Sequence, residues 1–159
     1  MYMNSAERLV ALLKEKGEKI CFAESCTGGL VSAAITAVAG SSAVFDGALC
    51  SYANRIKNTL LGVSEEVLET MGAVSPRSAL QMAEGALALF SADLAVSVTG
   101  IAGPDGGTPE KPVGTVFICA LHRDGTRILK RCRFTGNRDT VRSKSVEIAI
   151  KCAIDIIMG

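Results

Sequence analysis

Residues 19–38 read KICFAESCTGGLVSAAITAV, and they place a polar turn of small residues between two apolar segments. The continuous apolar run of residues 19–23 predicts a short buried strand, and residues 30–38 are typical of a helix packed against it. The turn can present a hydroxyl to a ligand, because free backbone N–H groups and the dipole of the following helix favour negative charge near Ser25. The same position suits an ordinary helix N-cap, so this stretch alone leaves both interpretations of Ser25 open.

The composition of the chain favours an α/β protein with an aliphatic core. Its 159 residues suffice for one domain with a core of its own, so we expect residues 1–159 to form a single domain. Hydrophobic residues make up 48% of the chain but aromatic residues only 4%, so aliphatic side chains must fill the interior. The 17 basic and 16 acidic side chains nearly cancel, so no global charge points to nucleic acid or a membrane surface.

The cysteines and the N-terminus predict a soluble cytoplasmic protein. The six cysteines form no C-x-x-C pair, and several fall within apolar patterns, so they are interpreted as small buried side chains in a reducing compartment. The first residues do not show the charged segment followed by an apolar segment that is typical of a signal peptide. No apolar run approaches the ~20 residues of a membrane helix, so no membrane partner is expected.

Local start and stop signals divide the rest of the chain into helices and strands. Helical patterns begin near residues 4–5, 30, 55, 64, 76 and 139. Strands are expected at residues 19–23, 44–52, 93–99, 115–121 and 126–134. The last two strands flank Asp124-Gly125, a strong hairpin signal, and must therefore be antiparallel. Together these elements predict a single-domain three-layer α/β/α sandwich whose mixed sheet includes an antiparallel hairpin.

Residues 100–114 are a candidate binding loop. The segment holds five glycines and three prolines, and it is too long and irregular to be a simple connection.

Elimination narrows the chemistry that these residues permit. The chain has a single histidine, His122, which precedes the hairpin turn and is predicted to be solvated surface. Triads that use histidine have no support in the local pattern, and the scattered cysteines offer no ligand spacing for a metal. Lysine remains as the general base for a hydroxyl, provided that burial lowers its pKa. Lys57 is the candidate because it lies just beyond an apolar strand; the alternative is a surface lysine in the first turn of a helix.

Three polar strand ends are expected at one edge of the sheet. They are the turn at Ser25, the segment that begins with Tyr52 and Asn54, and Thr99-Gly100. Ligands of open α/β sheets collect at such an edge, so we expect a pocket there. Arg138 could add a guanidinium for a phosphate, although on local grounds a solvated arginine at a helix start is slightly favoured.

Six ordered motifs resemble those of a known family. They are AESCTGG at residues 23–29, YANRIK at 52–57, GAVS at 72–75, VTGIAGP at 98–104 with GG at 106–107, PVGTV at 112–116, and FTGNR at 134–138. On these motifs, the chain resembles the C-terminal domain family of the competence/damage-inducible protein CinA, which also includes stand-alone nicotinamide mononucleotide deamidases. The resemblance covers essentially the whole chain. Larger members carry an additional N-terminal domain resembling molybdopterin-binding proteins.

The resemblance implies hydrolysis of the carboxamide of nicotinamide mononucleotide to nicotinic acid mononucleotide and ammonia, with neither a metal nor another cofactor. In the family pattern Ser25 is the nucleophile and Lys57 its base. Tyr52 and Thr99 would support this pair, and Arg138 would contact the nucleotide.

Further substrate contacts are predicted around the strand ends. Backbone N–H groups in the segment Cys26, Thr27, Gly28 and Gly29 are candidate oxyanion donors, with the glycines allowing close approach. Asn54 and Gly100 are expected to complete the binding surface. Cys26 itself is an alternative nucleophile, since a thiolate beside a helix N-terminus is reactive, but the usual histidine partner is missing.

A different class of function also fits the sequence. The chain could be a non-catalytic nucleotide- or partner-binding module linked to competence or a DNA-damage response, although the simultaneous presence of Ser25, Tyr52, Lys57 and Thr99 argues against it. A small-molecule pyridine nucleotide is the expected ligand, with no nucleic acid partner. Apolar helix faces favour a homo-oligomer, a dimer or larger.

Overall fold

The strand, turn and helix predicted at residues 19–38 form β1 (Ile20–Glu24) and α2 (Leu30–Thr36) in the computed structural model, which describes residues 2–159. The other strands are β2 (Phe45–Cys50), β3 (Leu94–Gly100), β4 (Thr115–His122) and β5 (Arg127–Arg133). The other helices are α1 (Tyr2–Lys16), α3 (Asn54–Leu61), α4 (Glu65–Thr70), α5 (Pro76–Phe90) and α6 (Arg138–Met158), with a 3-10 turn η1 (Ser41–Ala43). The predicted order of elements is confirmed.

The five strands form one mixed sheet in the order β2-β1-β3-β4-β5. The pairs β1–β2 and β1–β3 are parallel, whereas β4 is antiparallel to both β3 and β5. The β4–β5 pair is the predicted hairpin. Because β1, β2 and β3 run in the same direction, the residues that follow them meet at one edge of the sheet.

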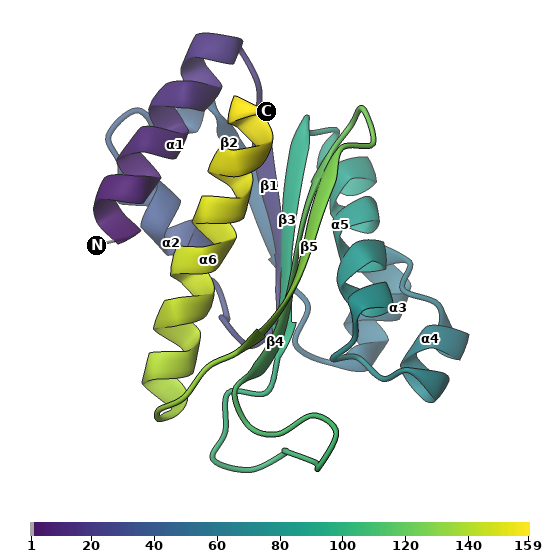
Figure 1. Cartoon of the computed structure of the whole chain (residues 1–159). Helices are drawn as coiled ribbons and strands as arrows, with labels where there is room; N and C mark the ends of the chain where they lie inside the picture. The colour runs from purple at the N-terminus through teal and green to yellow at the C-terminus, as the bar shows by residue number, and fades with distance from the viewer. Residues whose placement is uncertain (1) are drawn as a thin grey trace.

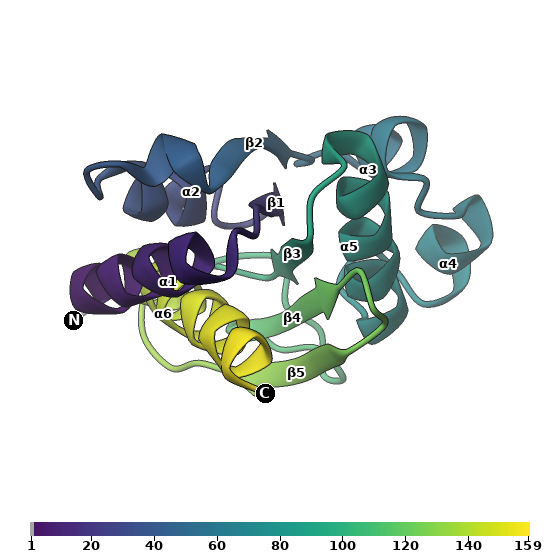
Figure 2. The ribbon, with the colours of Figure 1, turned by 90° about the horizontal axis from the view of Figure 1, so that it is seen from above.

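Helices cover both faces of the sheet (Figure 1). One layer holds α1, α2 and α6, and the other holds α3, α4 and α5; Figure 2 shows the sheet between them. Each face has its own apolar cluster, one built around Leu9, Phe22 and Ile150 and the other around Ala79, Met82 and Phe117. The predicted three-layer α/β/α fold is therefore confirmed.

Burial along the strands follows from this arrangement. Every residue of β1 is buried, and β3 and β4 are buried except at their last residue, because helices cover both faces of the central strands. The edge strand β5 alternates between exposed and half-buried residues. Cys50 ends the other edge strand, β2, and is exposed, so the prediction of a buried side chain is wrong for this cysteine.

Within residues 2–159, no helix combines the length and apolar character needed to cross a membrane.

Candidate active site

A pocket of about 220 Å³ opens at the carboxyl edge of the parallel strands. All three predicted strand ends contribute to it. Its lining residues are Ser25, Cys26, Tyr52, Asn54, Lys57, Ala73, Val74, Thr99, Gly100, Ala102 and Arg138.

Ser25 and Lys57 form a buried hydrogen-bonded pair in this pocket. Lys57 Nζ lies 3.0 Å from Ser25 Oγ, although Ser25 is in the turn that follows β1 and Lys57 belongs to α3, 32 positions further along the chain. Only 1% of Lys57 is exposed, and burial lowers the pKa of its amine from the ordinary 10.5 to about 8. The surface alternative for Lys57 is therefore wrong, and a neutral amine is accessible near physiological pH.

Two backbone carbonyls determine how the neutral amine of Lys57 points. Nζ lies 2.6 Å from the Ser51 oxygen and 3.2 Å from the Tyr52 oxygen, and both oxygens can only accept hydrogen bonds. A neutral amine has two N–H groups, which these carbonyls occupy, and one lone pair. The lone pair is left for the Ser25 hydroxyl, which then donates to the amine. This is the orientation that a general base requires.

Glu24, which sequence reasoning missed, holds the turn behind Ser25. Its carboxylate is fully buried and accepts hydrogen bonds from the N–H groups of Gly29, Val31 and Ser32 and from the Ser32 hydroxyl. These are the orphan donors at the start of α2, so the carboxylate takes the place of a helix cap. The N-cap interpretation of Ser25 is thus wrong: the capping position is Gly29, and Ser25 faces Lys57.

The two glycines of the turn shape its backbone, and their N–H groups donate to protein acceptors rather than to a ligand. Gly28 and Gly29 have φ values of 56° and 100°, a left-handed conformation that glycine adopts without strain. The Gly28 N–H donates to the Ser25 carbonyl and the Gly29 N–H to Glu24. The prediction that both glycines offer free N–H groups is therefore wrong. Elsewhere in residues 25–29, the N–H groups of Cys26 and Thr27 have no acceptor in the described part of the chain.

Arg142, also missed from the sequence, contacts the same turn from α6. Its Nε donates to the Cys26 carbonyl at 3.1 Å, and a terminal nitrogen donates to the Thr27 carbonyl at 3.2 Å. Thr27 as a whole is fully buried and does not line the pocket, so the structure does not bring this predicted contact residue to a ligand. A signal for Arg142 was its spacing, four residues after Arg138 and thus on the same helical face.

Tyr52 and Arg138 meet at the mouth of the pocket. The Arg138 guanidinium donates to the Gly103 carbonyl at 2.7 Å and to the Tyr52 hydroxyl at 3.2 Å. The Tyr52 side chain is exposed, so Tyr52 reaches Lys57 only through its backbone carbonyl. The start of the 100–114 loop thus borders the pocket through the Gly103 contact.

Thr99, Gly100 and Asn54 line the pocket in different ways. The Thr99 hydroxyl donates to the Ala73 carbonyl at 2.9 Å and so ties β3 to the segment before α5. A Cβ on Gly100 would lie 2.6 Å from Val116, so close packing against β4 requires glycine there. Asn54 opens α3 at the pocket rim.

The structure disfavours Cys26 as a nucleophile. The side chain is 6% exposed, and burial raises the pKa of its thiol from the ordinary 9.0 to about 11. A neutral thiol lacks the charge that makes cysteine reactive.

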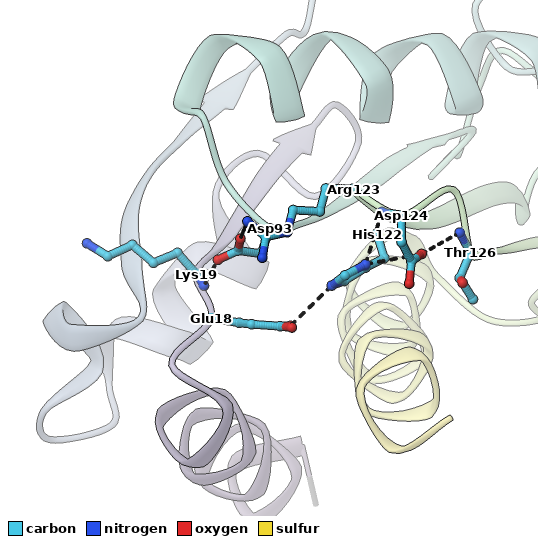
Figure 3. Close-up of polar contacts among 7 residues, drawn as sticks. All are labelled: Glu18, Lys19, Asp93, His122, Arg123, Asp124 and Thr126. Atoms are coloured by element: carbon cyan, nitrogen blue, oxygen red, sulfur yellow. Dashed lines mark hydrogen bonds and ion pairs between the residues drawn. The ribbon is translucent and has the colours of Figure 1, made fainter.

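His122 lies at the opposite edge of the sheet, beside the start of β3. Its ring lies between Glu18 and Asp124, with nitrogen-to-oxygen distances of 3.3 and 3.1 Å, and only 14% of the side chain is exposed (Figure 3). The prediction of a solvated surface side chain is wrong, because the segment after α1 folds over the hairpin end. The histidine does not take part in the pocket around Ser25.

Among residues 2–159, no group of three or more His, Cys, Asp or Glu side chains is placed to hold a metal ion.

The fold and pocket define a three-layer α/β protein in which a serine and a lysine are hydrogen-bonded at the carboxyl edge of the sheet. The sequence model of the CinA C-terminal domain matches residues 3–157. The chain belongs to this family.

Individual relatives agree with this assignment. The chain is 49% identical over 144 residues to a protein of Enterobacter agglomerans named "Nicotinamide-nucleotide amidohydrolase PncC", covering 91% of this chain and 88% of that one. It is 46% identical to a "CinA-like protein" of Thermotoga maritima over 91% of this chain but only 35% of the relative. The chain thus spans about a third of the length of such CinA-like relatives.

Solved structures of the family have the same fold. The competence/damage inducible protein CihA from Agrobacterium tumefaciens superposes with a TM-score of 0.95 at 42% identity, covering 99% of this chain and 95% of that one. A CinA superfamily protein from Klebsiella pneumoniae gives a TM-score of 0.95 at 32% identity, covering 99% and 98% of the two chains.

Proposed function

We propose that this chain is a nicotinamide-nucleotide amidohydrolase, which hydrolyses the carboxamide of nicotinamide mononucleotide to nicotinic acid mononucleotide and ammonia. The observation that carries the proposal is the buried hydrogen bond between Ser25 and Lys57, with the lysine pKa lowered to about 8. The relative named as a nicotinamide-nucleotide amidohydrolase is 49% identical over most of both chains, which supports the substrate class.

The first step is acylation of Ser25. Lys57 Nζ accepts the hydroxyl proton while Ser25 Oγ forms a bond to the carboxamide carbon, and negative charge develops on the carboxamide oxygen. The C–N bond then breaks. The leaving nitrogen takes the proton from the Lys57 ammonium and departs as ammonia, which leaves an ester between Ser25 and the nicotinoyl group.

Water completes the reaction. Lys57, again neutral, accepts a proton from a water molecule as its oxygen attacks the ester carbon. The bond to Ser25 Oγ breaks, the serine recovers its proton from Lys57, and the carboxylate product leaves. The base, the nucleophile and the backbone donors are all parts of this chain, so the proposed reaction includes no metal ion or other cofactor.

The remaining pocket residues are assigned to binding. Arg138 carries a fixed positive charge at the pocket mouth, which suits the phosphate of a nucleotide, and Tyr52 beside it offers an aromatic face. Thr99 and Asn54 line the walls and are assigned to the pyridine nucleotide. In this proposal residues 1–159 form one catalytic domain, which acts in the cytoplasm.

Direct assay with nicotinamide mononucleotide tests the proposal. Ammonia and nicotinic acid mononucleotide are measured in parallel for the wild type, Ser25→Ala and Cys26→Ala, with a run in excess EDTA to test metal independence. We expect both products in equal amounts from the wild type, with or without EDTA, and from Cys26→Ala at no less than a tenth of the wild-type rate. Ser25→Ala should release neither. Tight nucleotide binding without ammonia would favour the non-catalytic binding module instead.

A further inference from the structure

Tyr52 lies along the pocket between the proposed base and the mouth. Its backbone carbonyl lies 3.2 Å from Lys57 Nζ, and at its other end the hydroxyl accepts a hydrogen bond from Arg138, also at 3.2 Å. The aromatic ring joins these two ends, so it lies between Lys57 and Arg138 on one wall of the pocket. Tyr52 is 65% exposed, so neighbouring side chains leave much of the ring uncovered.

The proposed substrate has its groups in the same order. In nicotinamide mononucleotide a pyridinium ring carries the carboxamide, and the ribose joins that ring to the phosphate. A carboxamide at Ser25 and a phosphate at Arg138 therefore place the pyridinium ring and the ribose in the interval that Tyr52 spans. The inference below thus rests on the proposed function.

The charges of the pocket leave few partners for a pyridinium ring, which is permanently positive. Within residues 2–159, two basic side chains, Lys57 and Arg138, line the pocket, and no carboxylate does. Glu24 precedes Ser25, but it is fully buried and its carboxylate is bonded to the start of α2. In the same part of the chain, Tyr52 supplies the only aromatic ring of the lining. The negative face of an aromatic ring attracts a cation that lies within about 6 Å of its centre.

We propose that the Tyr52 ring binds the pyridinium of the substrate through a cation–π contact, and so selects oxidised pyridine nucleotides over their reduced forms. The reduced nucleotide carries the same carboxamide, ribose and phosphate, but its dihydropyridine ring is neutral. Arg138 therefore contributes to the binding of both forms through the same phosphate. The ratio of the two affinities isolates the contribution of the charged ring.

The test measures the dissociation constants of nicotinamide mononucleotide and its reduced form by isothermal titration calorimetry. Turnover is an unsuitable readout, because the positive ring also makes the carboxamide more electrophilic. All measurements therefore use Ser25→Ala, which cannot form the ester. In this background Tyr52→Phe keeps the aromatic ring and Tyr52→Leu removes it. Leu60→Ala, an exposed change on α3 outside the pocket lining, is the control, and thermal melting verifies that each variant is folded.

We expect the Ser25→Ala protein to bind the oxidised nucleotide about 3- to 20-fold more tightly than the reduced one. Tyr52→Phe should keep most of this preference, even if losing the hydrogen bond to Arg138 weakens the binding of both forms. Tyr52→Leu should abolish the preference, and Leu60→Ala should leave it unchanged. Equal affinities in Ser25→Ala, or a full preference in folded Tyr52→Leu, would overturn the inference.

Ammonia release by the wild type separates this inference from the proposed function. Ammonia from nicotinamide mononucleotide, together with equal affinities for the two forms in Ser25→Ala, would support the amidohydrolase and reject the role of the Tyr52 ring. A preference for the oxidised form that depends on the ring, without ammonia release, would support the ring contact and reject the amidohydrolase. Neither binding nor ammonia release would overturn both.

Discussion

The pH dependence of turnover tests the role of Lys57 most directly, because only the neutral amine can accept the Ser25 proton. Burial lowers the pKa of this amine from 10.5 to about 8. At pH 7 the neutral fraction is therefore about 9%, roughly 300-fold more than for a lysine with its ordinary pKa. In the proposed mechanism, the lowered pKa is thus what makes Lys57 a usable base.

The sign of the effect follows from the same pKa. As the pH rises through 8, Lys57 loses its proton, so kcat/KM for nicotinamide mononucleotide should rise and then level off. Between pH 6.5 and 9.5 the neutral fraction grows about 30-fold, and the rate should follow it. The assay is initial-rate ammonia release across this range, with circular dichroism to verify folding at each pH.

Lys57→Arg is the matched variant, since a guanidinium keeps the positive charge but cannot lose its proton in this range. We expect its kcat to be at least about 100-fold lower at every pH, with no rising limb. A flat wild-type profile, a midpoint near 10, or a Lys57→Arg profile with the wild-type midpoint would refute the assignment of Lys57 as base.

Three other predictions concern the turn and the packing around it. Iodoacetamide should not inhibit turnover at pH 7.5, because the Cys26 thiol is buried with its pKa raised to about 11; rapid inactivation with label on Cys26 would contradict this. Glu24→Gln replaces the carboxylate that accepts three backbone N–H groups with an amide that has only one acceptor oxygen. The change should lower the free energy of unfolding by about 2 kcal/mol and Tm by about 4–8 °C. An unchanged melting curve would show that the carboxylate does not restrain the turn. Gly85→Ala should also lower Tm, because a Cβ there would overlap the Leu61 carbonyl where α5 crosses α3. Glu84→Gln, an exposed change on α5, is the control for both melts and should leave Tm unchanged.

The elements of the fold were predictable because their signals are local. Ser75 and Pro76 predicted the start of α5, and the Ser75 hydroxyl indeed accepts from the Ser78 N–H with Pro76 in the first turn. Asp124-Gly125 predicted the hairpin between β4 and β5 in the same way. Each of these signals acts within a few residues, so no tertiary contact was needed to interpret it.

The site was predictable only in part. The parallel strand ends predicted that Ser25, Tyr52 and Thr99 meet, because that follows from strand direction alone. Glu24 and Arg142 were missed because their partners depend on the tertiary fold. The contact between Arg142 and Cys26 joins residues 116 positions apart, and no local pattern encodes it.

The burial of individual side chains was the other feature that the sequence predicted poorly. His122 was predicted to be solvated, but Glu18 from the segment after α1 packs beside it, 104 positions away in sequence. Cys50 was predicted to be buried, yet the sheet ends at β2 and leaves it exposed. The sequence indicated a strand in each case, but which strand ends or edges are covered is decided by the assembled layers.

The attachment of α6 to the Ser25 turn has a consequence for biosynthesis. Ser25 and Lys57 belong to the first 57 residues, whereas Arg138 and Arg142 lie on the helix that follows all five strands of the sheet. A chain still on the ribosome, or one cut ahead of residue 138, would carry the proposed nucleophile and its proposed base without either arginine. The ability to hydrolyse substrate should therefore appear only when α6 has docked, so that no partly made chain acts prematurely.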